Sequence, residues 1–91
     1  MIPEGVTIVE ESAFCGCSSL TQVGIPSTLH TIKSNGFDGC SALESIIIPA
    51  HVTTFGDGVF ASCNQLTIYG QTGSAAETYA IENGIPFIPM E

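Results

Sequence analysis

A repeat with an interval of 23 residues runs through most of the chain and constrains its fold more than any other feature. Ile-Pro pairs begin at Ile2, Ile25 and Ile48, and other apolar positions follow at the same interval. The columns are Phe14, Phe37 and Phe60; Cys17, Cys40 and Cys63; Leu20, Leu43 and Leu66; Val6, Leu29 and Val52; and Val9, Ile32 and Phe55. Polar, variable residues fill the positions between them. The pattern predicts stacked coils that point the same side chains into a shared interior.

Each unit is expected to contain two extended segments. Residues 20–25 and 43–48 alternate at period two and predict short strands that end at proline. Residues 29–32 and 52–55 predict the second segment. The Phe-x-x-Cys stretch that follows is typical of a tight turn or a single 3₁₀ turn. These elements predict a β-rich solenoid, in which one unit alone is too short to bury a core.

The repeat ends near residue 70, and the remaining sequence predicts a cap. Ser74 and Glu77 fit a capping box, and Gly84 is a helix terminator, so we expect a helix from about 75 to 83. An extended strand follows at 85–89. Two domains are therefore expected: about three coils in residues 1–70, the first of them truncated, and a C-terminal cap in residues 71–91.

The first unit begins halfway through a coil and has no cap of its own. Ile2, Val6 and Val9 are apolar residues with nothing before them to cover them. Either upstream repeats are missing from this sequence, or two molecules associate through this end, and the two expectations are compatible.

The charge balance restricts the partners of the chain. Its net charge is -8, and Lys33 is its single basic residue apart from the histidines. Phosphate backbones and anionic lipids would be repelled, which argues against nucleic acid as a partner. No apolar run approaches the roughly 20 residues that a spanning helix requires, so membrane insertion is not expected. We predict no signal peptide in this fragment, because its start has no basic segment followed by an apolar stretch.

The cysteines and histidines do not form a predicted reactive centre. One coil separates neighbours in the column of three cysteines, so Cys17 and Cys63 would lie roughly 10 Å apart, too far for one zinc ion. We interpret these three as buried thiols and Cys15 as the outward, reactive one. His30 and His51 are interpreted as solvated; the alternative is a pH-sensitive or metal-binding pair. We predict no catalytic residues, no metal and no cofactor.

The repeat resembles a known family. Ile-Pro, Val-x-x-Ile, Ala-Phe-x-x-Cys and Leu-x-x-Ile recur, and residues 12–20 are close to the consensus of the BspA-like leucine-rich repeat. The match covers about residues 2–69 and departs at Gly36, Phe55 and Val59, which are changes of packing size. The resemblance implies a right-handed leucine-rich-repeat solenoid of the β-rich (α/β) class. It also implies an extracellular or cell-surface location, because such repeats occur in secreted or surface-attached proteins of bacteria, several linked to adhesion.

The outward residues of the first strands form the candidate binding face. They align as Thr21 with Glu44 and Thr67, Gln22 with Ser45, and Gly24 with Ile47. Ile47 would be an exposed apolar spot among polar neighbours; the alternative is an ordinary solvated strand surface. We predict a non-catalytic binding module for a protein (adhesion or matrix) or a glycan. A structural spacer and an accessory domain of a larger secreted hydrolase are the alternatives.

Overall fold

Short parallel strands and one helix make up the regular structure of this chain. The computed structural model describes residues 2–90. In chain order the elements are β1 (Ile8–Val9), β2 (Thr31–Ile32), β3 (Ser45–Ile48), β4 (Thr54–Phe55), β5 (Thr67–Gly70), α1 (Ala75–Glu82) and β6 (Phe87–Pro89). The helix is too short to span a bilayer, and no other helix occurs in the described part of the chain.

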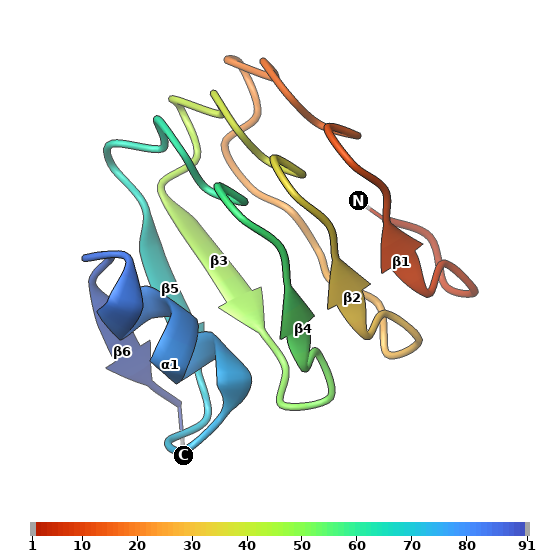
Figure 1. Cartoon of the computed structure of the whole chain (residues 1–91), viewed down its shortest axis with the longest axis vertical. Coiled ribbons are helices and arrows are strands. Elements are labelled where there is room, and N and C mark those ends of the chain that lie inside the picture. The colour runs from red at the N-terminus through yellow and green to blue at the C-terminus, as the bar shows by residue number, and fades with distance from the viewer. Residues whose placement is uncertain (1, 91) are drawn as a thin grey trace.

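The strands form two parallel sheets whose register follows the repeat. One sheet has the order β1-β2-β4, and the other has the order β3-β5-β6 (Figure 1). In the first sheet Val9 pairs with Ile32, and Ile32 pairs with Phe55, which reproduces the interval of 23 residues. We define unit 1 as residues 2–24, unit 2 as 25–47 and unit 3 as 48–70. The three units therefore lie side by side.

The phenylalanine column confirms that the units share one interior. The ring centroids of Phe14 and Phe37 are 5.1 Å apart, with the ring planes 4° from parallel. Phe37 and Phe60 follow at 5.6 Å and 11°. The other columns supply most of the buried side chains: Leu29, Val52, Ile32, Cys40, Leu43, Ile46 and Ile48. The core thus runs along the stacking direction, through the middle of each unit.

The Phe-x-x-Cys stretches are hydrogen-bonded turns, as predicted. The amide of Cys17 donates to the carbonyl of Phe14, and the amide of Cys40 donates to that of Phe37. Thiols link the units as well: Cys40 Sγ donates to the Phe14 carbonyl and Cys63 Sγ to the Phe37 carbonyl, each at 3.2 Å. Each of these two thiols therefore donates a hydrogen bond to a backbone carbonyl of the preceding unit. An apolar side chain at the same position could not donate this bond.

Two predictions about the first strands need correction. Residues 20–25 form no strand, although 45–48 do; Gly24 stands where unit 2 has Ile47, and a glycine weakens a strand interior. Thr67 pairs with Ser45 and not with Glu44. The physical reason is the residue missing from unit 3: the leucines of the two units keep an interval of 23, whereas the strands that follow pair at 22.

The C-terminal segment, residues 71–90, packs against unit 3. Helix α1 begins after Ser74, whose hydroxyl accepts from the Glu77 amide, while the Glu77 carboxylate accepts from the Gly73 amide. The bond from the Glu77 amide to Ser74 is the predicted half of a capping box, but the carboxylate accepts from Gly73 and not from the Ser74 amide, which donates to the Gln71 carbonyl. The helix ends at Glu82, with Asn83 as its C-cap, so it is one residue shorter than predicted. Its buried residues are Ala76 and Ala80.

Tyr79 connects the helix to the phenylalanine column. Its ring lies 4.9 Å from that of Phe55 and meets Phe60 edge-on at 6.1 Å. Its hydroxyl accepts a hydrogen bond from the Val59 amide at 3.0 Å. Burial raises the pKa of Tyr79, although hydrogen bonds from the Val59 and Phe60 amides act in the opposite direction. The neutral Tyr79 hydroxyl thus accepts from the Val59 amide at the end of the stack, in place of a backbone carbonyl.

We expect Tyr79→Phe to lower the free energy of unfolding by about 1 kcal/mol, because the Val59 amide loses its acceptor in a partly buried place. Urea denaturation followed by circular dichroism measures the change. The control is Tyr69→Phe on β5, whose hydroxyl makes no hydrogen bond with the described residues and whose loss should leave stability nearly unchanged. Equal stability of Tyr79→Phe and the native chain would contradict this role.

Candidate functional site

An apolar row crosses the outer face of the second sheet. Ile47 on β3 pairs with Tyr69 on β5, and Tyr69 pairs with Ile88 on β6. Side chains alternate along a strand, so these three lie on the face opposite to the buried Ile46, Ile48 and Ile68. Ile47 is 54% exposed and Ile88 is 45% exposed, while Tyr69 between them is half-buried. We call these three residues the apolar row.

Some of the predicted binding residues lie on the same face of the second sheet as the apolar row. Ser45 and Thr67 are direct neighbours and form a polar row beside the apolar one. Glu44 is exposed at the start of β3 but is not the partner of Thr67. Thr21 and Gln22 are exposed, in a segment of unit 1 that is not a strand. The structure therefore brings Ser45, Ile47 and Thr67 together and leaves the other three at the margin.

Two residues of the apolar row, Tyr69 and Ile88, are not predicted by the repeat. Tyr69 lies in the shortened unit, whose register the columns alone do not fix. Ile88 lies beyond the repeat, and only the pairing of β6 with β5 places it beside Tyr69. The sequence feature that could have identified Ile88 is the extended segment 85–89. Side chains alternate along it, so Ile88 points to the opposite face from its two neighbours.

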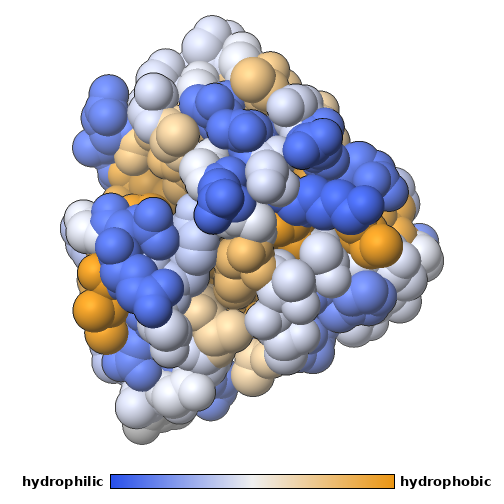
Figure 2. Space-filling model, viewed as in Figure 1, coloured by the Kyte–Doolittle hydropathy of each residue, from blue (hydrophilic) through white to orange (hydrophobic). Residues whose placement is uncertain are grey.

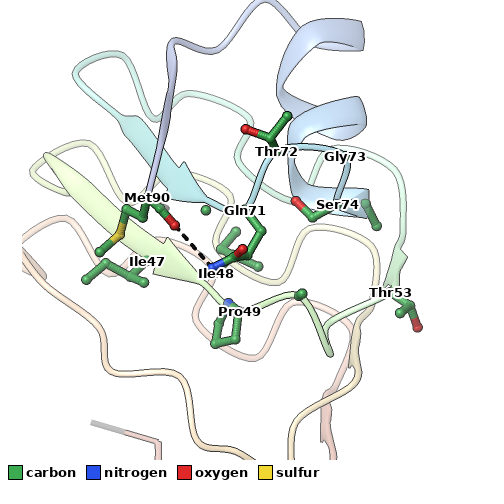
Figure 3. Close-up of a pocket in the computed structure, with 12 residues that line it drawn as sticks. Ile47, Ile48, Pro49, Thr53, Gln71, Thr72, Gly73, Ser74 and Met90 are labelled. Atoms are coloured by element: carbon green, nitrogen blue, oxygen red, sulfur yellow. Dashed lines mark hydrogen bonds between the residues drawn. The ribbon is translucent and has the colours of Figure 1, made fainter.

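A pocket adjoins the apolar row at the carboxyl ends of β3 and β5 (Figure 3). Its volume is about 730 Å³. Ile47 and Met90 stand at one side of it, and Gln71 to Ser74 cross the other; the Gln71 side chain donates to the Met90 carbonyl at 3.1 Å. Met90 is 42% exposed, so its side chain extends the apolar surface from the row to the pocket.

Figure 2 shows apolar surface in separate patches among polar groups, one of them at the left margin, where β6 and α1 lie in the same view. The single ion pair of the described residues joins Lys33 to Glu10 at 3.4 Å and lies on the first sheet, away from the apolar row. Both of its side chains are exposed, so it contributes little to stability.

The face of unit 1 that points away from unit 2 is a second apolar surface among the described residues. Phe14, Leu20 and Val23 are only half-buried, whereas their column mates in unit 2 are fully buried. Val6 and Cys17 share this intermediate exposure. Ile2 and Val9 are buried by the rest of their own unit and by the next, which the sequence did not predict.

The histidines and cysteines form no cluster with acidic residues that could hold a metal ion within the described part of the chain. Among residues 2–90, no three His, Cys, Asp or Glu side chains form a group that could hold a metal ion. His30 contacts its neighbour Thr31, and His51 Nε2 lies 3.1 Å from the Pro26 carbonyl, so the two histidines have separate partners. Cys15 is exposed as predicted. Burial raises the pKa of Cys40, and it raises that of Cys63 to about 11, so both thiols stay protonated near neutral pH.

Comparison with known proteins agrees with the repeat. The family model for the BspA type leucine rich repeat region matches residues 1–80. No curated protein and no solved structure shows a significant match. Repeats of this family are typically non-catalytic and generally belong to surface or secreted proteins of bacteria. On the register of its apolar columns and on this match, the chain belongs to the BspA-type leucine-rich-repeat family.

Proposed function

We propose that this chain is a non-catalytic binding module of a cell-surface or secreted bacterial protein, and that it recognises a protein through the apolar row. The observation that carries the proposal is the adjacency of Ile47, Tyr69 and Ile88 on three paired strands, with Met90 and the pocket beside them. A contiguous exposed apolar surface indicates an interaction site. A spacer would need no such surface.

The architecture that supports this function is a right-handed solenoid of coils in residues 1–70, with residues 71–91 as its cap. The stacked phenylalanines and the parallel pairing at 23 residues support the solenoid, and the contact of Tyr79 with Phe55 and Phe60 supports the cap. Stacked units present their strands as one ribbed surface, and this places single residues of neighbouring strands in one row.

The side chains of the apolar row are better suited to a protein partner than to a glycan. Isoleucine and methionine side chains gain free energy from burial against other apolar groups, at about 25 cal/mol per Å². Tyrosine is enriched in the centres of protein interfaces. The partner's contacting segment should be apolar and free of excess negative charge, because Glu44 borders the face and the chain carries a net charge of -8.

We expect Ile47→Lys to weaken binding at least about tenfold, because it puts a charge where the partner buries an apolar group. The full chain would be tested by surface plasmon resonance against immobilised matrix proteins, with a glycan array in parallel. The matched control is Ile81→Lys: Ile81 is 70% exposed on α1 and lies outside the sheet face, so binding should be unchanged.

Unchanged binding by Ile47→Lys would remove the apolar row as the site. Binding to glycans alone would replace the protein partner with a carbohydrate. A catalytic domain encoded in the same protein would support the alternative of an accessory domain of a secreted hydrolase. Absence of binding in both arrays would favour the spacer.

We also propose that the half-buried face of unit 1 supports self-association. Sedimentation velocity over a concentration series should show a dimer that becomes a monomer on dilution. Val23→Lys should keep the chain monomeric at every concentration, because a lysine in the contact would have to lose its water. Ile81→Lys, with the same charge change elsewhere, should still dimerise. A native chain that stays monomeric throughout would refute this contact.

A further inference from the structure

The backbone hydrogen bonds between successive Phe-x-x-Cys turns all have the same direction. In the Phe-x-x-Cys region, three amides of each unit donate to three carbonyls of the next. From unit 1 the donors are Ser12, Phe14 and Gly16, and the acceptors in unit 2 are Ser34, Gly36 and Asp38. From unit 2 the donors are Asn35, Phe37 and Gly39, and the acceptors in unit 3 are Asp57, Val59 and Ala61. The distances lie between 2.7 and 3.1 Å.

The corresponding amides of unit 3 are those of Gly58, Phe60 and Ser62. By the repeat they point away from unit 2, toward the C-terminal segment. No further unit stands there within the described residues, and the Tyr79 hydroxyl covers only the centre of the set, where it meets the Val59 and Phe60 amides. Within residues 2–90, no hydrogen bond engages the amides of Gly58 or Ser62.

Both of these amides belong to residues that line a cleft. The cleft has a volume of about 390 Å³ and lies between unit 3 and the end of the helix. On one side it is bounded by Gly58, Phe60 and Ser62 and on the other by Tyr79, Asn83 and Gly84. The open donors therefore face a space large enough for several ligand atoms, and a backbone amide without a protein acceptor needs water or a ligand.

Ser62 also carries backbone strain at this cleft. Its φ is 62°, in the left-handed region, where units 1 and 2 have Gly16 at 77° and Gly39 at 80°. A residue with a Cβ adopts this conformation at a cost. Of the three equivalent positions, only the one at the cleft has a side chain that can hydrogen-bond.

We infer that this cleft is a second binding site, separate from the apolar row, and that it receives main-chain carbonyl oxygens of an uncharged peptide segment at the amides of Gly58 and Ser62. The equivalent amides in units 1 and 2 already bind main-chain carbonyls, so the chemistry is the same as that observed inside the stack. Asp57 lies close enough to act on the Tyr79 hydroxyl, and its negative charge disfavours a carboxylate ligand.

The test is a titration of the ¹⁵N-labelled full chain with acetyl-alanyl-alanine amide, a blocked dipeptide with three carbonyls and no charge. The Ser62 and Gly58 amide signals should move and saturate. The Gly39 and Gly16 amides are internal controls in the same column as Ser62, because their donors are already bonded at 2.8 and 2.7 Å, and their signals should stay in place. Motion of all four to the same extent, or of none, would overturn the inference.

Two further measurements test whether the amide itself binds the ligand and whether the ligand is uncharged. The Ser62→Gly variant keeps the amide and relieves the backbone, so the signal of residue 62 should still respond to the dipeptide; loss of the response would assign the site to the hydroxyl and refute main-chain recognition. Sodium acetate at the same concentration and ionic strength should move these signals less than the dipeptide does. Larger shifts with acetate would replace the uncharged peptide with an anion.

Discussion

Phe37→Ala is expected to lower the free energy of unfolding by about 3–5 kcal/mol, the range measured for phenylalanine truncation in protein cores. Phe37 is fully buried, and its ring stacks on Phe14 on one side and on Phe60 on the other. Removing it leaves a cavity in the middle of the column, and neither neighbour can fill it without leaving its own unit. Loss of stacking on both sides adds to the loss of burial.

The matched control is Phe14→Ala. Phe14 stands in the same column, but it is half-buried and has a phenylalanine on one side only. Its truncation should cost clearly less than that of Phe37. Chemical denaturation of both variants gives the two free energies. Equal losses of unfolding free energy in the two variants would contradict the prediction. They would show that the phenylalanine column does not hold the units together.

Gly56→Ala is the second substitution for which we expect a large loss, about 2–3 kcal/mol, because overpacking is destabilising where the neighbouring atoms cannot give way. An added Cβ would lie within 2.8 Å of both the Cα and the side-chain oxygen of Ser34, and still closer to the Ser34 amide nitrogen. A backbone cannot move aside as a flexible side chain can, so the strand connection between units 2 and 3 would have to shift.

Lys33→Ala provides the control for Gly56→Ala, because Lys33 and Glu10 occupy the same repeat position in units 2 and 1. It replaces an exposed side chain and removes one surface ion pair, so we expect a change of less than about 1 kcal/mol. Thermal unfolding of both variants by circular dichroism measures the contrast. A stable Gly56→Ala chain would show that the approach of Ser34 to Gly56 is easily relaxed.

The column of Glu10, Lys33 and Gly56 also shows what the sequence could not predict. As a column of variable residues it indicated a position that faces water, which holds for the exposed Glu10 and Lys33. At Gly56 the backbones of two units approach each other, and only the three-dimensional path of the chain reveals this. A repeat predicts equivalent positions well, and it predicts poorly where one unit departs from the others.

The predictions that succeeded rest on long-range regularity. The column of Phe14, Phe37 and Phe60 predicted a shared interior because one position repeated in three units leaves few other packings. The candidate site depended instead on irregular features: the residue missing from unit 3, and the return of β6 beside β5. Ile47 could be predicted from its own repeat position, whereas its neighbours Tyr69 and Ile88 follow from pairing after the regularity ends.

The two prolines of the last strand region have a consequence for solubility. The Pro86 carbonyl accepts from the Ile68 amide and the Met90 amide donates to the Gly70 carbonyl, so Phe87 and Pro89 present their backbones to the free edge of β6. Pro89 has no N–H, and one donor is therefore missing from the short row that another chain would need to add a strand. The apolar face of the sheet can thus bind a partner, while the free edge of β6 disfavours the strand addition that leads to fibrils.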